Sequence, residues 1–153
     1  MKLPLKALFL CIAALLSSGL ACAQEDVIGY VKTATGNAAI VVDGQSTAAL
    51  PGAPLRKAYV LKTGNPGSIG VTLKDSTILS AGPDSEITLD DYAYAPGEDQ
   101  LKLAIRMAKG TLHYISGVIA KLKPEAVDIR TPTGLIGVRG TEFVVHVDPR
   151  DAQ

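Results

Sequence analysis

Apolar and polar residues alternate along several short segments of this chain. The clearest is residues 101–107, where leucine, isoleucine or methionine occupies every second position and Lys102 and Arg106 fall between them. The same period of two recurs in residues 69–73, 127–130 and 143–147. Such alternation is typical of a β-strand that buries one face and exposes the other. The pattern therefore predicts β-strands over most of the chain.

Glycine, proline, asparagine and aspartate punctuate these segments and predict turns between strands. The turn signals are Gly36-Asn37, Asp43-Gly44, Asn65-Pro66-Gly67, Gly82-Pro83-Asp84, Pro96-Gly97 and Lys109-Gly110. Asp43-Gly44 is the best hairpin candidate, because both residues tolerate a positive φ and an apolar run precedes them. One short helix is expected from Ser116 to Leu122, with Pro124 ending it.

Many short strands spaced about ten residues apart fit a β-sandwich, a β-roll or a β-solenoid. Periodicity does not choose among these folds. Ser76–Leu79 and Ser85–Leu89 echo one another weakly, but two units are too few to establish a repeat. We predict a compact all-β domain of the β-roll or solenoid-like kind.

The first 23 residues have the pattern of a signal peptide. Lys2 and Lys6 precede a continuous apolar run over residues 7–16, and small residues at Ala21 and Ala23 suit signal peptidase. We expect cleavage between Ala23 and Gln24. The apolar run is shorter than the roughly 20 residues that span a membrane. The protein is therefore expected to be exported, and to be periplasmic or secreted.

A lipid anchor on Cys22 is the alternative for this segment. Lipoprotein signal sequences usually have a leucine three places before the modified cysteine. Here that position is Gly19, which disfavours a lipoprotein. The intact mass of the exported protein tests this expectation, because diacylglyceryl addition would show directly.

Cleavage would leave residues 24–153 as one domain with a core at about residues 28–147. Both cysteines belong to the leader, so the domain is expected to hold no disulfide and no thiolate metal site. Without Lys2 and Lys6 it has 13 basic and 15 acidic residues. This balance argues against nucleic-acid binding. No second long apolar segment follows, so no membrane span is expected after cleavage.

Residues 130–145 are the most informative stretch of the chain. Gly134, Gly137 and Gly140 are spaced by three, and Arg139 lies between Val138 and Gly140 before a β-type run. Glycines so placed suit tight turns and close packing. They do not suit a phosphate loop, because neither Lys-Ser/Thr nor a helix start follows. We expect Arg139 to be a buried structural residue, with a recognition role as the alternative.

This stretch resembles the closing signature of the FecR-domain family. The residues that carry the resemblance are Thr131, Pro132, Gly134, Gly137, Val138, Arg139, Gly140 and Thr141. Weaker matches extend it over about residues 28–147. The chain departs from the family pattern at Arg56–Tyr59, where Gly-Asp is usual, and at Asp75-Ser76, where Asp-Gly is usual. Both departures fall in predicted turns.

The resemblance implies a role in signalling. In the iron-transport regulators that give the family its name, such a domain relays a signal from an outer-membrane receptor to a cytoplasmic sigma factor. Those regulators also have an anti-sigma segment and a transmembrane helix, and this sequence shows neither. We therefore expect any sensing to depend on a partner, such as an envelope or periplasmic protein, an outer-membrane receptor or a surface assembly.

Other polar residues give little support for catalysis or metal binding. His113 and His146 are single histidines, which is a poor zinc pattern. The acidic residues Asp84, Glu86, Asp90 and Asp91 lack the regular spacing of a calcium loop. No nucleophile motif is present. We expect no enzyme activity, no catalytic residue, no metal and no cofactor.

Tyr92 and Tyr94 are the best candidates for an interface. Alternation places both rings on one face of a strand, and tyrosine combines contact area with a polar tip. The alternative is that both rings complete the edge of the core. The sequence thus favours a non-catalytic binding or signal-relay domain, with a structural or accessory role in a surface assembly as the second hypothesis and a hydrolase as the third.

Overall fold

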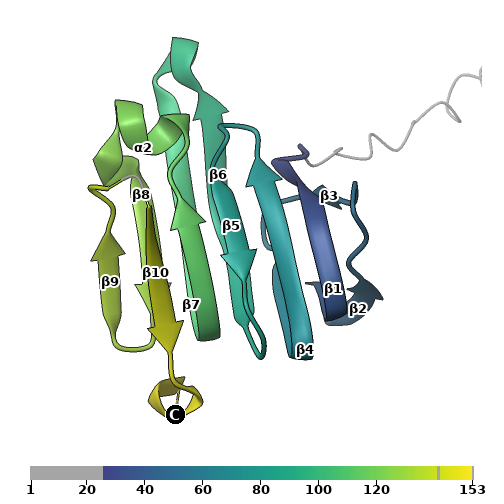
Figure 1. The fold of residues 1–153 in the computed structure, drawn as a ribbon. Coiled ribbons are helices and arrows are strands. Elements are labelled where there is room, and N and C mark those ends of the chain that lie inside the picture. Colours follow the sequence, from purple (N-terminus) through teal and green to yellow (C-terminus); the bar gives the residue numbers. More distant parts are fainter. Residues whose placement is uncertain (1–25, 141, 153) are drawn as a thin grey trace, which may run out of the picture.

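The computed structural model describes residues 26–140 and 142–152 (Figure 1). The expected leader, its cleavage site at Ala23-Gln24, and Thr141 lie outside the described residues. The strands are β1 (Gly29–Val42), β2 (Gln45–Ala48), β3 (Pro54–Leu55), β4 (Val60–Leu73), β5 (Ile78–Ala81), β6 (Glu86–Ala95), β7 (Gln100–Ile115), β8 (Val127–Thr131), β9 (Gly134–Gly137) and β10 (Glu142–Val147). The helices are α2 (Val118–Leu122) and the 3₁₀ turns η1 (Pro96–Glu98), η2 (Pro124–Ala126) and η3 (Pro149–Ala152).

The all-β prediction is confirmed. The expected short helix is also present as α2, which begins two residues later than predicted and gives way to η2 at Pro124. None of the helices in the described ranges is long and apolar enough to cross a membrane.

Four rows of strand form the centre of the sheet. β1 pairs antiparallel with β4, and β4 pairs with both β5 and β6. β5 and β6 each pair in turn with β7, so the two short strands form one interrupted row between β4 and β7. β10 and β8 then add to opposite halves of β7, β8 in parallel, and β9 pairs with β8. Figure 1 shows β10, β7, β5, β4 and β1 side by side.

Each of these rows is interrupted near its middle, and the interruptions lie beside one another. In β1 the register shifts between Gly36 and Ala38, opposite Gly67 of β4. The row of β5 and β6 breaks at residues 82–85, where the Asp84 N–H donates to the carbonyl of Gly64. In β7 the register with β6 shifts beside Lys109, and Gly110 has a φ of 96°. We call this aligned set of positions the corner.

The corner explains why three predicted turns are wrong. Gly36-Asn37, Asn65-Pro66-Gly67 and Lys109-Gly110 lie inside strands of 14, 14 and 16 residues. Glycine permits a positive φ at a bend in a strand as readily as at a chain reversal, so the local sequence does not distinguish the two. Many of the strands are short, as predicted, but β1, β4 and β7 are longer than expected for the same reason. Asp43-Gly44 does form the β1–β2 hairpin.

Both halves of the bent sheet bury their apolar side chains in one cluster. Ile69 and Leu112 come from one half, and Leu61 and Ile105 come from the other; all are at most 1% exposed. The two halves therefore face one another across a shared core. The solenoid-like stacking towards which the prediction leaned is not confirmed, because β5 and β6 do not pair with each other and most neighbouring strands are antiparallel.

The signature stretch differs from the sequence prediction. Pro132 and Thr133 form a two-residue turn between β8 and β9, and a Cβ atom added at Gly134, Gly137 or Gly140 would meet open space. The prediction of a buried guanidinium is wrong: Val138 is 3% exposed, whereas Arg139 is exposed. Adjacent residues of extended chain point to opposite sides, so burying Val138 turns Arg139 outward.

Candidate functional site

A buried carboxyl group lies where β4, β5, β6 and α2 meet. Asp75 is fully buried, and its Oδ2 accepts hydrogen bonds from the Thr77 hydroxyl at 2.7 Å and the Ile119 N–H at 3.3 Å. Its Oδ1 accepts from the Tyr92 hydroxyl at 3.1 Å. The carbonyl of Asp75 also accepts from the N–H of Val118 at 2.7 Å. This group fixes four elements and has no access to a substrate.

Of the two predicted interface tyrosines, Tyr92 belongs to the core. It is 7% exposed, and its hydroxyl also accepts the Asp75 N–H at 2.9 Å. Burial, followed by the nearby charge of Asp75, raises the pKa of Tyr92 well above its usual value. Its hydroxyl therefore remains a protonated donor. Tyr94, two residues further along the same face, is only half-buried.

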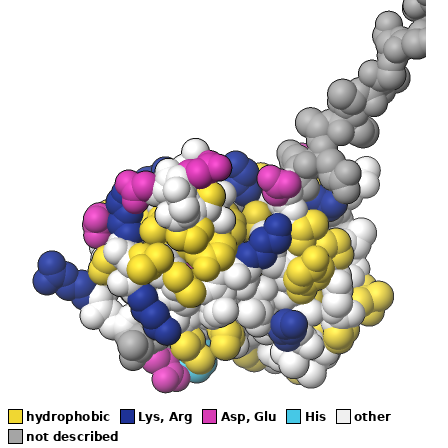
Figure 2. All heavy atoms as spheres, turned by 90° about the horizontal axis from the view of Figure 1, so that it is seen from above, with side chains coloured by type: hydrophobic (Ala, Val, Ile, Leu, Met, Phe, Trp, Pro, Cys, Tyr) yellow, Lys and Arg dark blue, Asp and Glu magenta, His cyan; other side chains and the backbone are white. Residues whose placement is uncertain are grey.

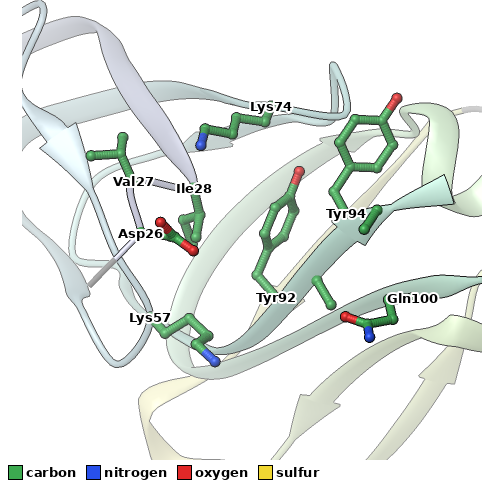
Figure 3. A pocket seen from close by; sticks show the side chains of 10 residues that line it. Asp26, Val27, Ile28, Lys57, Lys74, Tyr92, Tyr94 and Gln100 are labelled. Carbon is green, nitrogen blue, oxygen red and sulfur yellow. The ribbon is translucent and has the colours of Figure 1, made fainter. Parts of the chain in front are cut away.

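Tyr94 lines a cavity of about 600 Å³ between β6 and the beginning of β1 (Figure 3). One wall consists of residues 92–95, and the opposite wall consists of residues 26–28 and Lys74. Lys57 and Gln100 complete the lining. Figure 3 shows Lys57 and Lys74 on opposite sides of Tyr92. We call this cavity the β6 groove.

Among the described residues, no strand pairs with the β6 edge that forms this wall of the groove, so we call it the free edge. β4 pairs with β6 only at Glu86–Thr88, and the last backbone bonds on that side join Leu89 to Ala58 and Tyr59. Beyond Leu89, no backbone hydrogen bond between described residues reaches this edge of β6. The opposite edge pairs with β7 up to Ala95. An unpaired edge presents N–H and C=O groups to which another strand can add.

The charges around the groove are unevenly paired. Asp91 forms ion pairs with Lys57 at 3.6 Å and with Lys102 at 3.4 Å. Burial alone would raise the pKa of Asp91, but the Tyr92 N–H and these two lysines outweigh it and lower the pKa. No ion pair among the described residues includes Lys74. Asp26 is the carboxylate that lines the groove itself.

The remaining candidates lie elsewhere, on the surface. His113 contacts Glu142 at 2.6 Å, and His146 contacts the Thr111 hydroxyl at 2.9 Å. Within residues 26–140 and 142–152, no three metal-ligating side chains come together. Glu86 and Asp90 form ion pairs with Lys62 and Arg106 respectively. Arg139 lines a separate, shallow cavity beside Glu125 and Asp128.

Seen from the end at which α2 lies, hydrophobic side chains gather in two groups with a basic side chain between them (Figure 2).

Of the residues that line the β6 groove, the sequence analysis pointed to Tyr94 but not to Lys57, Lys74 or Gln100. These residues come from three separate segments, and nothing in their local patterns links them.

Comparison with known families gives a match to the FecR protein family over residues 59–153. This is more than half of the chain. The chain belongs to the FecR family. The matched region begins beside β4 and contains Asp75, the signature stretch and the corner positions of β4 to β7, but not the corner position of β1. Residues 28–58 precede it, although the sequence resemblance included them.

No curated protein matches the chain. Among solved structures, it is similar to a "Cell surface anchoring domain" at 25% sequence identity and a TM-score of 0.39. That similarity covers 41% of this chain and 84% of the other.

The two departures from the FecR pattern coincide with unusual backbone conformations. Ala58 has a φ of 65° and Ser76 a φ of 69°, a region that disfavours residues with a Cβ atom. We expect Ala58→Gly and Ser76→Gly each to raise the free energy of unfolding by about 1 kcal/mol, because glycine removes this strain. Chemical denaturation measures the change.

Ala48→Gly is the matched control. Ala48 is an exposed β2 residue without a positive φ, so glycine there should lower stability by about 0.5 kcal/mol. Destabilisation by all three substitutions would contradict the strain at Ala58 and Ser76.

Proposed function

We propose that this FecR-family chain is an exported, non-catalytic module that binds a protein or envelope partner and relays a signal through it. The observation that carries the proposal is the β6 groove, where a free strand edge, a half-buried tyrosine and two lysines meet. Tyrosine rings and open strand edges are common elements of protein recognition. The family's link to signalling across the cell envelope agrees with this role.

The non-catalytic part of the proposal rests on the chemistry of the groove. Its polar side chains are those of Asp26, Lys57, Lys74, Tyr94 and Gln100, together with the hydroxyl of Tyr92, which is already bonded to Asp75. A nucleophile held against a base is the arrangement that acyl or glycosyl transfer needs. This set is better suited to holding a ligand than to transforming it.

Photocrosslinking from position 94 tests the proposed function. A photoreactive phenylalanine analogue replaces Tyr94 in the exported protein, and the same analogue replaces exposed Val144 on β10 as the control. We expect a specific envelope partner to be captured from position 94 and not from position 144. The same capture from both positions, or none from position 94 under several growth conditions, would refute the proposal.

A structural role in a surface assembly is the alternative, and the outer face of the β10, β7, β5, β4 and β1 layer favours it. The side chains exposed there include Tyr30, Ile78 and Val144, whose exposed fractions are 44%, 36% and 63%. Threonine and serine fill many of the positions between them, as in the exposed pair Thr35 and Ser68. Cell fractionation separates the two roles: a soluble periplasmic pool favours binding and relay, and co-purification with a surface structure favours assembly.

A further inference from the structure

We propose that the β6 groove binds an extended peptide segment of the partner, which adds as a strand to the free edge of β6 and places a carboxylate against Lys74. This inference rests on the proposed function and names the chemistry of its ligand. It combines three observations: the unpaired edge, the dimensions of the groove and the unmatched charge of Lys74.

Tyr94 is the residue of the free edge at which a peptide strand can pair with both the N–H and the C=O. The N–H of Tyr92 donates to the side chain of Asp91 at 2.9 Å, so it is not used in the ladder with β7. In an antiparallel ladder every second residue directs its N–H and C=O to the same edge. Tyr94 therefore directs its own N–H and C=O into the groove, where a peptide strand can pair with both.

The free edge is long enough for a short strand. It runs from Asp90 to Ala95, and six residues at about 3.4 Å each extend for roughly 20 Å, the usual length of a strand. The ring of Tyr94 is half-buried, so it offers a narrow apolar contact for alternate side chains of a peptide. A sugar ring is bound best by a broad exposed aromatic face, and the groove lacks one among its described lining residues.

Charge selects the kind of peptide. The carboxylate of Asp91 already forms ion pairs with both Lys57 and Lys102. Lys74 reaches the groove from the opposite wall, and no described acidic side chain lies within ion-pair distance of it. Among the described residues that line the groove, Lys57 and Lys74 carry ammonium groups, and Asp26 carries the one carboxylate. A glutamate or aspartate in the peptide balances the excess.

The test uses the exported protein and a set of eight-residue peptides of alternating valine and threonine. The set carries one glutamate at each position in turn, with matched glutamine and lysine versions. NMR titration should show shifts of the Tyr94 amide, with the best glutamate peptide binding about fivefold more tightly than its glutamine match. N-methylation of the amides on the peptide edge that pairs with β6 should abolish binding. N-methylation of the amides on the other edge should leave the affinity unchanged.

Variants of the protein test the role of Lys74. Lys74→Gln should reduce the affinity for the glutamate peptide about fivefold and leave that for the glutamine peptide unchanged. The control is Lys62→Gln, an exposed residue of β4 that pairs with Glu86 outside the groove and should change neither affinity. Equal binding of all peptides, or equal sensitivity to methylation on both edges, would overturn strand addition beside Lys74.

Two outcomes separate this inference from the proposed function. If position 94 captures a partner but no glutamate peptide binds at millimolar concentration, strand addition is wrong and the binding role stands. Binding of an acidic oligosaccharide that depends on Lys74, without binding of the peptides, also overturns the inference. Failure of capture from position 94 removes the proposed function itself.

Discussion

Asp75→Ala should lower the free energy of unfolding by about 4 kcal/mol, which is a large part of the total stability of a domain of this size. The substitution removes the acceptor for the hydroxyls of Tyr92 and Thr77 and for the N–H groups of Thr77 and Ile119. All four donors would then be buried without this partner, and each unsatisfied group costs about 1–3 kcal/mol. Urea denaturation followed by circular dichroism measures the loss.

Asp90→Ala provides the comparison for Asp75. Asp90 also lies on the sheet, but its carboxylate pairs with Arg106 at 2.7 Å at an exposed position. Exposed ion pairs contribute about 0–1 kcal/mol, so this variant should remain close to the parent protein. Similar decreases in the free energy of unfolding of both variants would contradict the large contribution assigned to the hydrogen bonds of Asp75.

Gly110→Ala should destabilise the fold by about 3 kcal/mol. Gly110 has a φ of 96°, and a Cβ atom there would overlap the side chain and Cα of Ser85. Ser85 cannot readily move, because its hydroxyl donates to the carbonyl of Thr111 at 3.2 Å and accepts the Thr111 N–H at 2.9 Å. Both the strained backbone and the overlap therefore contribute. Thermal denaturation should show a melting temperature several degrees below that of the parent protein.

Gly137→Ala is the matched control, because Gly137 belongs to the proposed signature, but a Cβ atom there would meet open space and its φ is not positive. We expect a change within about 0.5 kcal/mol. A larger loss at Gly137 than at Gly110 would contradict the assignment of the tighter packing to the corner and not to the signature.

Alternation along the chain was sufficient to predict strands, because the period of two follows from which side chains face the core. In residues 101–107, Leu103, Ile105 and Met107 are buried as that period requires. The sequence did not predict where the chain reverses direction and where it only bends. Gly110 and Gly36 looked like reversals, since glycine serves bends and reversals equally and only distant pairing decides between them.

The candidate site was predictable only in part. Tyr92 and Tyr94 are equivalent by periodicity, but a carboxyl group from another loop bonds to the first ring and leaves the second partly open. Similarly, Arg139 appeared enclosed by its apolar and glycine neighbours, whereas the outward turn of the chain at Val138 exposes it. The β6 groove requires that residues 26–28, Lys57 and Lys74 converge, which is a property of the tertiary fold.

The corner also affects how the protein forms. Gly36 abuts Pro66, Gly67 abuts Asn37, and Gly110 abuts Ser85, so each bend is shaped by the strand beside it. The polypeptide should consequently assemble in one concerted, comparatively slow step governed by contacts distant in sequence, and partly formed intermediates should be short-lived.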